Sequence, residues 1–362
     1  MIRVFPLDRF SDKLEREILT MGVYPRLTPI PATPWQAMSL LQKAIRRGKT
    51  ELALRASANL LATSPDRFWR RAGIIAFEDV GVADLPTLGM VAAALRGKRF
   101  RQSLGGEWTV AAAIVVRMAA APKNRAADDL LCLLDSWPGL AENRLRLARL
   151  PVSRLRLVAL TAEQLPLRAL ALRMIIGDRD LAPARLGSAD LGFDLLDEVG
   201  VAPTTLAIAE EGYRRTGQLL APLVALLSLE NGLREQTEDD PLPEESAIAD
   251  LPGWALDMFT REGRAALAKL LQTDAGISAW ARQSLPVAGR VEVLAQALFR
   301  VESGLCLNRR DGARGKELRR IMERECFGLP PGQADNALTL MRAAIPDLNA
   351  IRAQVMGGKH HA

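Results

Sequence analysis

The chain has 362 residues, of which 49% are hydrophobic and 25% are charged, a composition typical of a soluble globular protein with ample material for a core. Its formal net charge of +6 is a mild basic excess over this length. The only two histidines, His360 and His361, lie in the last three positions. This distribution argues against a Ser-His-Asp triad, a Cys-His pair or a His-ligated zinc site inside the fold.

The cysteines and the apolar runs indicate the compartment. Cys132, Cys306 and Cys326 have no CxxC spacing, so we expect buried thiols in a reducing environment. The start of the chain lacks the apolar run of a secretory signal, and no apolar run is long enough to cross a bilayer. The sequence therefore predicts a cytoplasmic protein without a membrane partner.

Helical signals extend along nearly the whole chain, and sustained alternation of β-branched residues is absent. The expected fold class is all-α and multi-helical. Shifts in composition and charge suggest these segments: a helix and proline-rich arm over 1–34, a helical domain over 35–135, a second over 136–234, an acidic linker over 235–249, a C-terminal helical domain over 250–356 and a disordered tail over 357–362.

The first segment combines a short charged helix, expected over Asp12–Leu19, with four prolines between residues 25 and 34. Closely spaced prolines favour an extended chain. The sequence leaves open whether this arm lies across its own domain or reaches a neighbouring subunit.

The most legible helices follow the arm. Ser64 followed by Pro65 predicts a helix start, because the hydroxyl can cap the first turn and proline needs no N–H partner at the first helical position. Gly81 predicts the end of that helix, and Asp84 is expected to cap the next one. The segment Thr109–Ala120 is apolar almost all round and predicts a central buried helix.

Two motifs suggestive of phosphate binding do not meet the requirements of a P-loop. The string Arg47-Gly48-Lys49-Thr50 lacks the first glycine, since position 43 is lysine, and an amphipathic helix precedes it where a strand is required. A second Gly-Lys string, at Gly315-Lys316, is followed by glutamate in place of the Mg²⁺-binding hydroxyl. We expect no nucleotide hydrolysis and no cofactor.

Acidic residues offer two further interpretations. Glu78, Asp79, Asp84 and Glu107 could supply ligands for Mg²⁺, but pairing with Arg70 or Arg71 and helix capping explain them better. The acidic segment 235–246 indicates a solvated linker, with mimicry of phosphate for a basic partner as the alternative.

Basic residues gather in clusters that could contact a phosphate backbone through sequence-neutral, salt-sensitive attraction, or could simply form solvated faces. Phe100 adds an aromatic ring able to stack on an unpaired base. The string 253–264 is expected to be a helix with an Asp257–Arg261 ion pair, or a ligand site. The clusters are Arg46/Arg47/Lys49, Arg67/Arg70/Arg71, Lys98/Arg99/Arg101 and Arg309/Arg310/Arg314/Lys316/Arg319/Arg320.

Residues 35–131 resemble the helical region that follows the ATPase module in the replication-associated recombination protein A family (the MgsA / Werner-helicase-interacting type of AAA+ protein). The similarity covers the stretch 41–54, the string Arg70–Asp84 with its E-D-V-G-V-A-D pattern, and the later Ala121-Pro122-Lys123. Phe77 and Leu85 depart from the family pattern, and the AAA+ module has no counterpart in this sequence. Matching positions that we interpret as structural are Glu78, Asp79, Gly81, Asp84, Pro122 and Lys123.

The resemblance implies a fold like the oligomerisation collar of clamp-loader-type ATPases. We therefore expect a non-catalytic scaffold or adaptor of DNA replication, repair or recombination, not an enzyme and without a metal. The alternatives are a sequence-neutral DNA-binding protein and an enzyme that uses carboxylates and arginine. Expected partners are DNA, an AAA+ ATPase or another replication or repair protein, and further copies of the chain. The residues expected to contact DNA or a partner are Arg67, Arg70, Arg71, Lys98, Arg99, Phe100 and Arg101.

Overall fold

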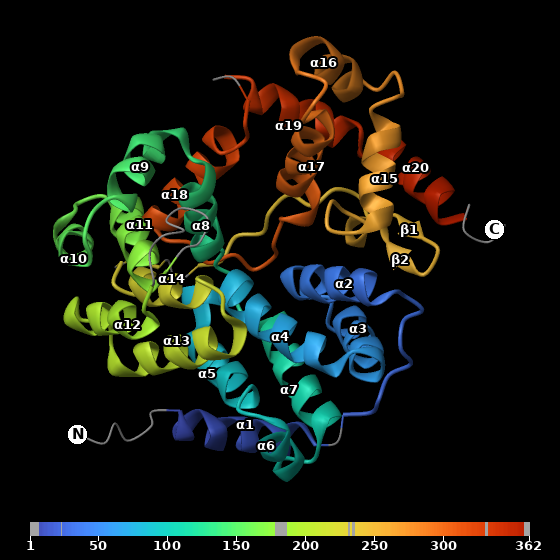
Figure 1. The fold of residues 1–362 in the computed structure, drawn as a ribbon. Helices are drawn as coiled ribbons and strands as arrows, with labels where there is room; N and C mark the ends of the chain where they lie inside the picture. The colour runs from blue at the N-terminus through green and yellow to red at the C-terminus, as the bar shows by residue number, and fades with distance from the viewer. Residues whose placement is uncertain are drawn as a thin grey trace. The chain divides into compact units, whose positions relative to one another are not determined.

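The computed structural model describes residues 7–22, 24–177, 187–230, 232–233, 236–329 and 332–357. The predicted all-α class is confirmed: the described chain is built of helices, apart from one antiparallel pair of two-residue strands (Figure 1). The strands are β1 (Ala247–Ile248) and β2 (Leu251–Pro252). No helix in these described ranges is long and apolar enough to cross a membrane.

The chain forms two compact units, each assembled from separate segments. Unit 1 comprises residues 1–24, 69–237 and 310–322, and unit 2 comprises residues 25–68, 238–309 and 323–362. Helix α4 (Pro65–Ile75) carries the chain from unit 2 into unit 1. The expected segment 35–135 is therefore divided, since residues 35–68 belong to unit 2 and residues 69–135 to unit 1.

Unit 1 is helical throughout its described part. Its elements after α4 include two short irregular helices, the π-helix η1 and the 3₁₀ helix η2, which connect α4 to α5. The elements are α1 (Asp8–Met21), η1 (Ala76–Val80), η2 (Gly81–Asp84), α5 (Leu85–Ala94), α6 (Lys98–Ser103), α7 (Glu107–Ala120), α8 (Ala126–Ser136), η3 (Pro138–Leu140), α9 (Ala141–Ala148), α10 (Val152–Thr161), α11 (Leu165–Ile176), α12 (Ala189–Glu198), α13 (Pro203–Thr216), α14 (Leu220–Leu227) and most of α18 (Ala313–Glu325).

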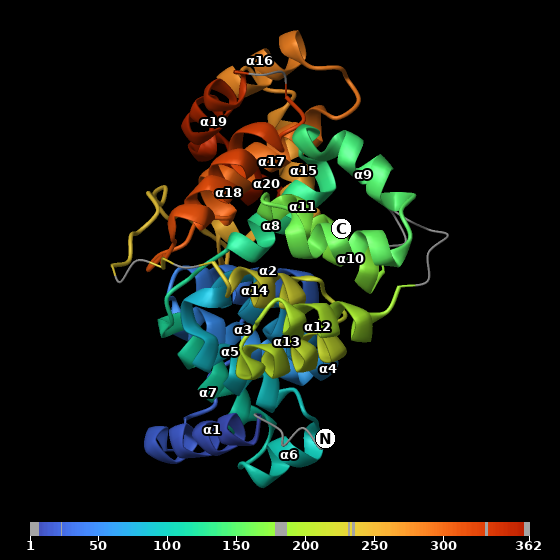
Figure 2. The same cartoon turned by 90° about the vertical axis from the view of Figure 1, so that its left-hand side faces the viewer.

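The core of unit 1 forms where apolar helices cross. Helix α7 buries nearly every residue from Val110 to Ala119, as its apolar composition predicted, and packs against α1 and α5. Phe10 of α1 lies against Gly89 of α5, where a side chain would collide with its ring. Figure 2 shows α10 beside α11 and α13 beside α14, and these pairs pack closely. Burial of these apolar surfaces is the main stabilising contribution to the unit.

Unit 2 contains the remaining elements. Its core gathers aliphatic residues of α15, α16, α17, α19 and α20, including the fully buried Leu267, Leu298 and Leu348. Helices α2 and α3 pack side by side, and α2 starts with a capping box in which Thr33 and Gln36 exchange hydrogen bonds. The elements are α2 (Pro34–Arg46), α3 (Thr50–Thr63), β1, β2, η4 (Gly253–Ala255), α15 (Arg261–Leu270), α16 (Gly276–Ser284), α17 (Arg290–Leu298), η5 (Phe299–Ser303), α19 (Ala334–Ala343) and α20 (Ile345–Gly357).

The proline-rich arm lies on its own unit. Ile30 is 1% exposed, and its backbone N–H donates to the carbonyl of Arg55 in α3. The amide of Asn59 donates to the carbonyls of Ile30 and Ala32 at 2.9 and 3.0 Å. These contacts answer the question that the sequence left open for residues 25–33. The first helix, α1, is longer at both ends than the expected Asp12–Leu19.

The acidic segment is only partly a solvated linker. Asp240 is buried, its carboxylate accepts from the backbone N–H of Cys306 at 2.8 Å, and it lies 2.9 Å from the guanidinium of Arg309. Glu238 pairs with Arg309 through reciprocal backbone hydrogen bonds. The expectation of a solvated linker is wrong at Asp240, because a buried arginine distant in sequence supplies its counter-charge. Of the predicted tail over 357–362, all but Gly357 lies outside the described residues.

Candidate functional site

The residues expected to contact DNA or a partner differ in exposure. On α4, Arg67 and Arg70 are exposed and Arg71 is half-buried. On α6, Lys98 and Arg99 are exposed. Among the residues that the structure describes, Arg70, Lys98 and Arg99 make no ion pair, so their charges face solvent.

Arg101 does not belong to this exposed set, and its prediction as a contact residue is corrected. Its guanidinium stacks over the ring of Trp69 at 4.0 Å from the centroid, and its Nε donates to Glu107 at 2.9 Å. The Trp69 indole N–H also donates to the Glu107 carboxylate. Arg101 thus connects α6, a helix of six residues, to Trp69 of α4 and Glu107 of α7. Phe100 is half-buried and lies under the guanidinium of Arg96, at 5.8 Å from its centroid.

The family-like motif forms a buried ion cluster centred on Arg125, which we call the Arg125 cluster. The guanidinium of Arg125 donates to Glu78, at 3.1 Å, and to Asp79 and Asp128. Asp79 and Arg125 are almost completely buried. The π-helix η1 presents Glu78 and Asp79 to this partner. Arg125, 46 residues after Asp79, is a partner that the sequence analysis did not name when it suggested Arg70 or Arg71.

The other motif residues pack around the same turn. Gly81 has a φ of +53° and lies against the carbonyl oxygen of Asn124, where a Cβ would collide. The buried ammonium of Lys123 donates to the carbonyls of Ala119, at 3.1 Å, and Ala121. Pro122, between them, is half-buried. These contacts end α7 and fix the turn into α8, so the motif residues hold the fold together.

Asp84 performs the capping role that the sequence predicted. Its carboxylate accepts from the backbone N–H of Thr87 at 3.1 Å and from the Thr87 hydroxyl at 2.6 Å. Arg117 approaches the same carboxylate at 3.3 Å. The four carboxylates considered as Mg²⁺ ligands are thus engaged in three places. Glu78 and Asp79 share Arg125, Asp84 lies at Thr87 and Arg117, and Glu107 lies at Trp69 and Arg101.

Unit 2 holds a second buried cluster, which the sequence analysis did not predict. One face of α2 carries Ser39 and Lys43, and Arg47, the C-cap residue of α2, follows at the same spacing of four residues. The ammonium of Lys43 lies 2.9 Å from the Asp257 carboxylate and donates to the Ser39 hydroxyl at 2.6 Å. That hydroxyl in turn donates to the carbonyl of Ala255 at 2.7 Å. Since the serine proton is committed to a carbonyl and Lys43 acts as donor, this pair is not arranged as nucleophile and base.

The electrostatics of Lys43 reflect its burial. Desolvation lowers the pKa of Lys43, because the charged ammonium is disfavoured away from water, and the Asp257 carboxylate opposes this shift. The same carboxylate accepts from the backbone N–H of Phe259 at 3.1 Å. This turn interrupts the helix that the sequence predicted across 253–264, and α15 starts only at Arg261, capped by Thr260. The predicted Asp257–Arg261 pair is therefore wrong, since Asp257 faces Lys43.

The next turn of α2 contacts the second π-helix, η5. Arg46 donates to the carbonyl of Ser303 and Arg47 to the carbonyl of Glu302, both at 2.8 Å. The Glu302 carboxylate accepts two hydrogen bonds from Arg352, at 3.0 and 2.7 Å. We call the residues Arg46, Arg47, Trp254, Glu302, Ser303 and Arg352 the Arg47 cluster.

The pKa of Arg47 is shifted by its surroundings. Its guanidinium lies 4.6 Å from the centroid of the Trp254 ring, and both residues are buried. Burial lowers the pKa of Arg47 to about 10, with Glu302 opposing the shift and Arg46 adding to it. Of the expected solvated face Arg46/Arg47/Lys49, only Lys49 is exposed, where it pairs with Glu245 at 3.2 Å.

Arginines of the basic cluster at residues 309–320 also pair with groups of their own unit. Arg309 is buried at Asp240, Arg310 donates to the carbonyl of Ala83 at 3.4 Å, and Arg314 pairs with Glu230 and Glu317. These partners lie far away in sequence, except Glu317, so no local pattern indicated them.

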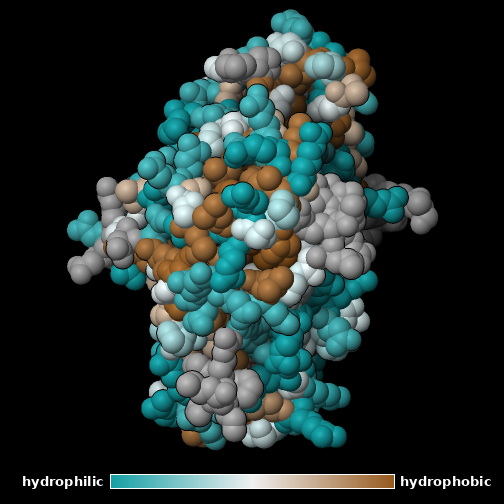
Figure 3. Space-filling view, turned by 60° about the vertical axis from the view of Figure 1, so that its left-hand side comes forward, coloured by the Kyte–Doolittle hydropathy of each residue, from teal (hydrophilic) through white to brown (hydrophobic). Residues whose placement is uncertain are grey.

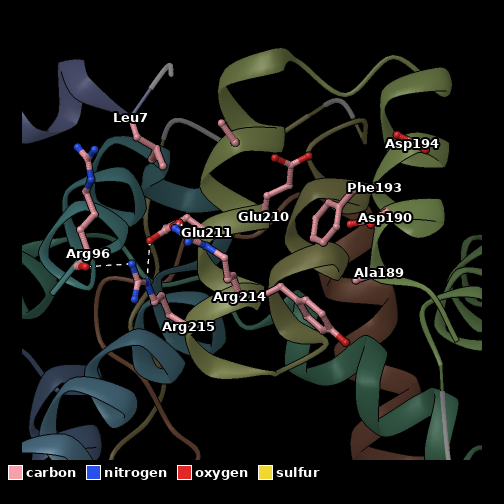
Figure 4. A pocket seen from close by; sticks show the side chains of 12 residues that line it. Leu7, Arg96, Ala189, Asp190, Phe193, Asp194, Glu210, Glu211, Arg214 and Arg215 are labelled. Atoms are coloured by element: carbon pink, nitrogen blue, oxygen red, sulfur yellow. Dashed lines mark hydrogen bonds and ion pairs between the residues drawn. The ribbon is translucent and has the colours of Figure 1, made fainter. Parts of the chain in front are cut away.

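A pocket of about 910 Å³ opens on unit 1 between α12 and α13 (Figure 4). Arg96 and Arg215 lie on one side, and Asp190 and Asp194 on the other. Glu211 pairs with Arg214 and Arg215, so part of the charge is already neutralised. Tyr213 and Phe193 meet edge to face at 5.9 Å, and burial raises the pKa of Tyr213. The sequence analysis did not identify this pocket.

Exposed apolar side chains also occur on unit 1. The face in Figure 3 shows hydrophobic surface interrupted by hydrophilic side chains. The exposed large apolar residues of this unit from α9 onward are Leu145, Val152, Leu157 and Leu191. Scattered exposed apolar residues of this kind are normal in folded proteins.

Comparison of the chain with protein-family models, with curated proteins and with solved structures finds no match. The family likeness of residues 35–131 therefore stays a prediction from the sequence.

Proposed function

We propose that the chain is a non-catalytic scaffold or adaptor that works in DNA replication, repair or recombination and contacts the phosphate backbone of DNA through unit 1. The supporting observation is the basic edge formed by Arg70, Lys98 and Arg99, whose exposed cations lack carboxylate partners in the described structure. Phosphates close to such cations release condensed counterions, which gives sequence-neutral affinity. We call these three residues the basic edge.

The attachment of α6 supports this assignment. Arg101, Trp69 and Glu107 form a partly buried clasp, so α6 presents Lys98 and Arg99 from a fixed position. A cationic surface on a fixed element loses little conformational entropy on binding. The remaining exposed cation on α4, Arg67, lies over Trp35 at 5.9 Å and belongs to unit 2.

The carboxylates support a scaffold over an enzyme. Asp79, Glu302 and Asp257 are each buried and paired with a cation, which stabilises a fold but leaves no carboxylate among these three free to move a proton. The resemblance to an oligomerisation collar adds self-association and an AAA+ ATPase partner to the proposal. Light scattering of the purified chain tests self-association directly.

The DNA contact is tested by measuring the affinity for a duplex over a range of salt concentrations. The double variant Lys98→Glu/Arg99→Glu is compared with the matched variant Arg149→Glu/Arg154→Glu, which reverses two exposed cations of the same unit. We expect weaker binding for the first variant alone, and a slope of log K against log salt reduced by about 2. Equal weakening by both variants, or no binding by the parent chain, would contradict the proposal.

A further inference from the structure

The pocket between α12 and α13 combines open space with side chains of opposite charge on its two sides. Its volume of about 910 Å³ leaves room for a small organic molecule. Arg96 and Arg215 lie on one side, and Asp190 and Asp194 lie on the other (Figure 4). The three residues of the basic edge do not line this pocket, so binding here would be a property separate from DNA contact.

The acidic side of the pocket belongs to α12. Phe193 and Asp194 follow Asp190 by three and four residues, so the three side chains share one face of the helix. Both aspartates are exposed, and within the described chain their carboxylates have no hydrogen bond and no ion pair. Glu210 also lines the pocket but has an interaction of its own. Carboxylates one helical turn apart repel each other, and a cation beside them relieves that repulsion.

The basic side belongs mainly to α13, where two arginines share one carboxylate. Glu211 is buried and accepts from Arg214 at 2.9 Å and from Arg215 at 2.8 Å. Its single negative charge balances only one of the two guanidinium groups. Arg215 donates in addition to the uncharged backbone carbonyl of Arg96, whose own side chain pairs with Asp8 at 2.9 Å. One positive charge therefore remains on α13, where the Arg214 side chain is 64% exposed.

An aromatic contact joins the acidic helix to the basic helix. Phe193 of α12 and Tyr213 of α13 meet edge to face at 5.9 Å, and both line the pocket. No hydrogen bond holds the Tyr213 hydroxyl within the described chain, and burial raises the pKa of this group, so it stays protonated and able to donate. The two rings offer apolar surface to the hydrocarbon part of a ligand.

We propose that this pocket binds a small dipolar molecule, which carries a carboxylate at one end and an ammonium group at the other. The carboxylate pairs with the arginines of α13, since a guanidinium fork matches its geometry. The ammonium group pairs with the two aspartates of α12, and the hydrocarbon between the charges contacts the two rings. A molecule with only a negative charge would be repelled by the aspartates, and one with only a positive charge would leave Arg214 unmatched.

Isothermal titration calorimetry of the full chain tests this assignment with two dipolar probes, γ-aminobutyrate and ε-aminocaproate. Each probe is compared with the fatty acid and the alkylamine of the same carbon number, which carry one charge each. We expect at least one dipolar probe to bind at least about tenfold more tightly than both of its singly charged counterparts, because each removes one charged hydrogen-bonding group. The proposal is overturned if neither dipolar probe binds more tightly than its counterparts.

Variants of the two sides test where the probe binds. Asp190→Asn/Asp194→Asn should raise the Kd of the dipolar probe at least about tenfold. Asp197→Asn/Glu198→Gln is the matched control, since it removes two exposed carboxylates of the same helix that do not line the pocket. Arg214→Gln should lower the affinity for the dipolar probe to that for the alkylamine. Equal affinity of the first variant and its control, or an unchanged preference for the dipolar probe in Arg214→Gln, would overturn the proposal. Circular dichroism checks that each variant is folded.

Discussion

The Arg125 cluster of unit 1 and the Arg47 cluster of unit 2 are both built from buried arginines and carboxylates. They differ in whether the buried hydrogen-bond donors have partners in the described structure. Each has a π-helix that presents a buried carboxylate, Asp79 in η1 and Glu302 in η5. Around Arg125, three carboxylates surround one guanidinium. Around Arg47, several buried donors remain without hydrogen-bond partners in the described structure. The buried donors of Arg125 have partners, and several buried donors of the Arg47 cluster have none in the described structure.

This difference concerns hydrogen bonding, because both clusters are buried ion networks. Both are buried and both contain π-helices, which often occur at functional sites. Burial and unusual backbone therefore do not distinguish them. The distinguishing property is whether the buried hydrogen-bond donors find acceptors in the described structure.

The largest expected effect comes from breaking the complete cluster. Asp79→Asn leaves the shape of the side chain but removes a charge that Arg125 needs in a fully buried place. We expect the free energy of unfolding to fall by about 3–5 kcal/mol, because one partner of a buried pair is lost. Denaturant titration followed by circular dichroism measures this change.

Asp128→Asn is the matched control, since Asp128 contacts the same guanidinium but is half-buried. Its cost should be clearly smaller, about 1 kcal/mol, because water can compensate the lost charge. Equal costs for the two variants would show that burial does not set the strength of this network.

The sequence predicted features whose causes lie within a few residues. The start of α4 at Pro65 and the capping of α5 by Asp84 were predicted correctly, because a cap and its partner are separated by one turn. The all-α class followed from the length and apolar periodicity of the helical segments. The interior position of α7 followed from its composition alone.

The clusters could not be predicted, because their partners are distant in sequence. Arg125 lies 46 residues from Asp79, and Arg352 lies 50 residues from Glu302. Arg47 and Arg101 looked like solvated cations, since nothing near them in sequence indicates burial. An arginine pairs or stacks according to which residues the tertiary fold brings to it, so a cluster of cations in the sequence does not reveal its own exposure.

A smaller effect on stability, which depends on pH, is expected from Lys43 of unit 2. The pKa of Lys43 is lowered below its usual 10.5 by burial, so the unfolded chain binds this proton more tightly than the folded chain. Between the lowered pKa and 10.5, unfolding takes up a proton, and stability contributed by this residue rises with pH. The slope for one group is at most about 1.4 kcal/mol per pH unit.

The variant Lys43→Met/Asp257→Asn removes both charges of the pair, and the amide oxygen of the new asparagine can still accept from the Phe259 N–H. The difference in unfolding free energy between parent and variant, measured from about pH 8 to about pH 10, should shift in favour of the parent as pH rises. Lys49→Met is the control for an exposed lysine and should show no such trend. A difference that is flat with pH, or that shifts toward the variant, would contradict the assigned direction.

The smallest effects are expected from exposed ion pairs, which the two units share in nearly equal form. Lys49–Glu245 in unit 2 has side chains 45% and 44% exposed, and Arg156–Glu198 in unit 1 has side chains 42% and 41% exposed. Lys49→Ala and Arg156→Ala should each lower the free energy of unfolding by about 0–1 kcal/mol, because solvent screens both pairs. Denaturant titration of the two variants side by side checks this equality.

A loss above about 2 kcal/mol for Lys49→Ala alone would exceed what an exposed pair contributes. It would mean that Lys49 stabilises the fold together with the buried Arg47 cluster beside it. The comparison between the two clusters would then have to include Lys49 and Glu245.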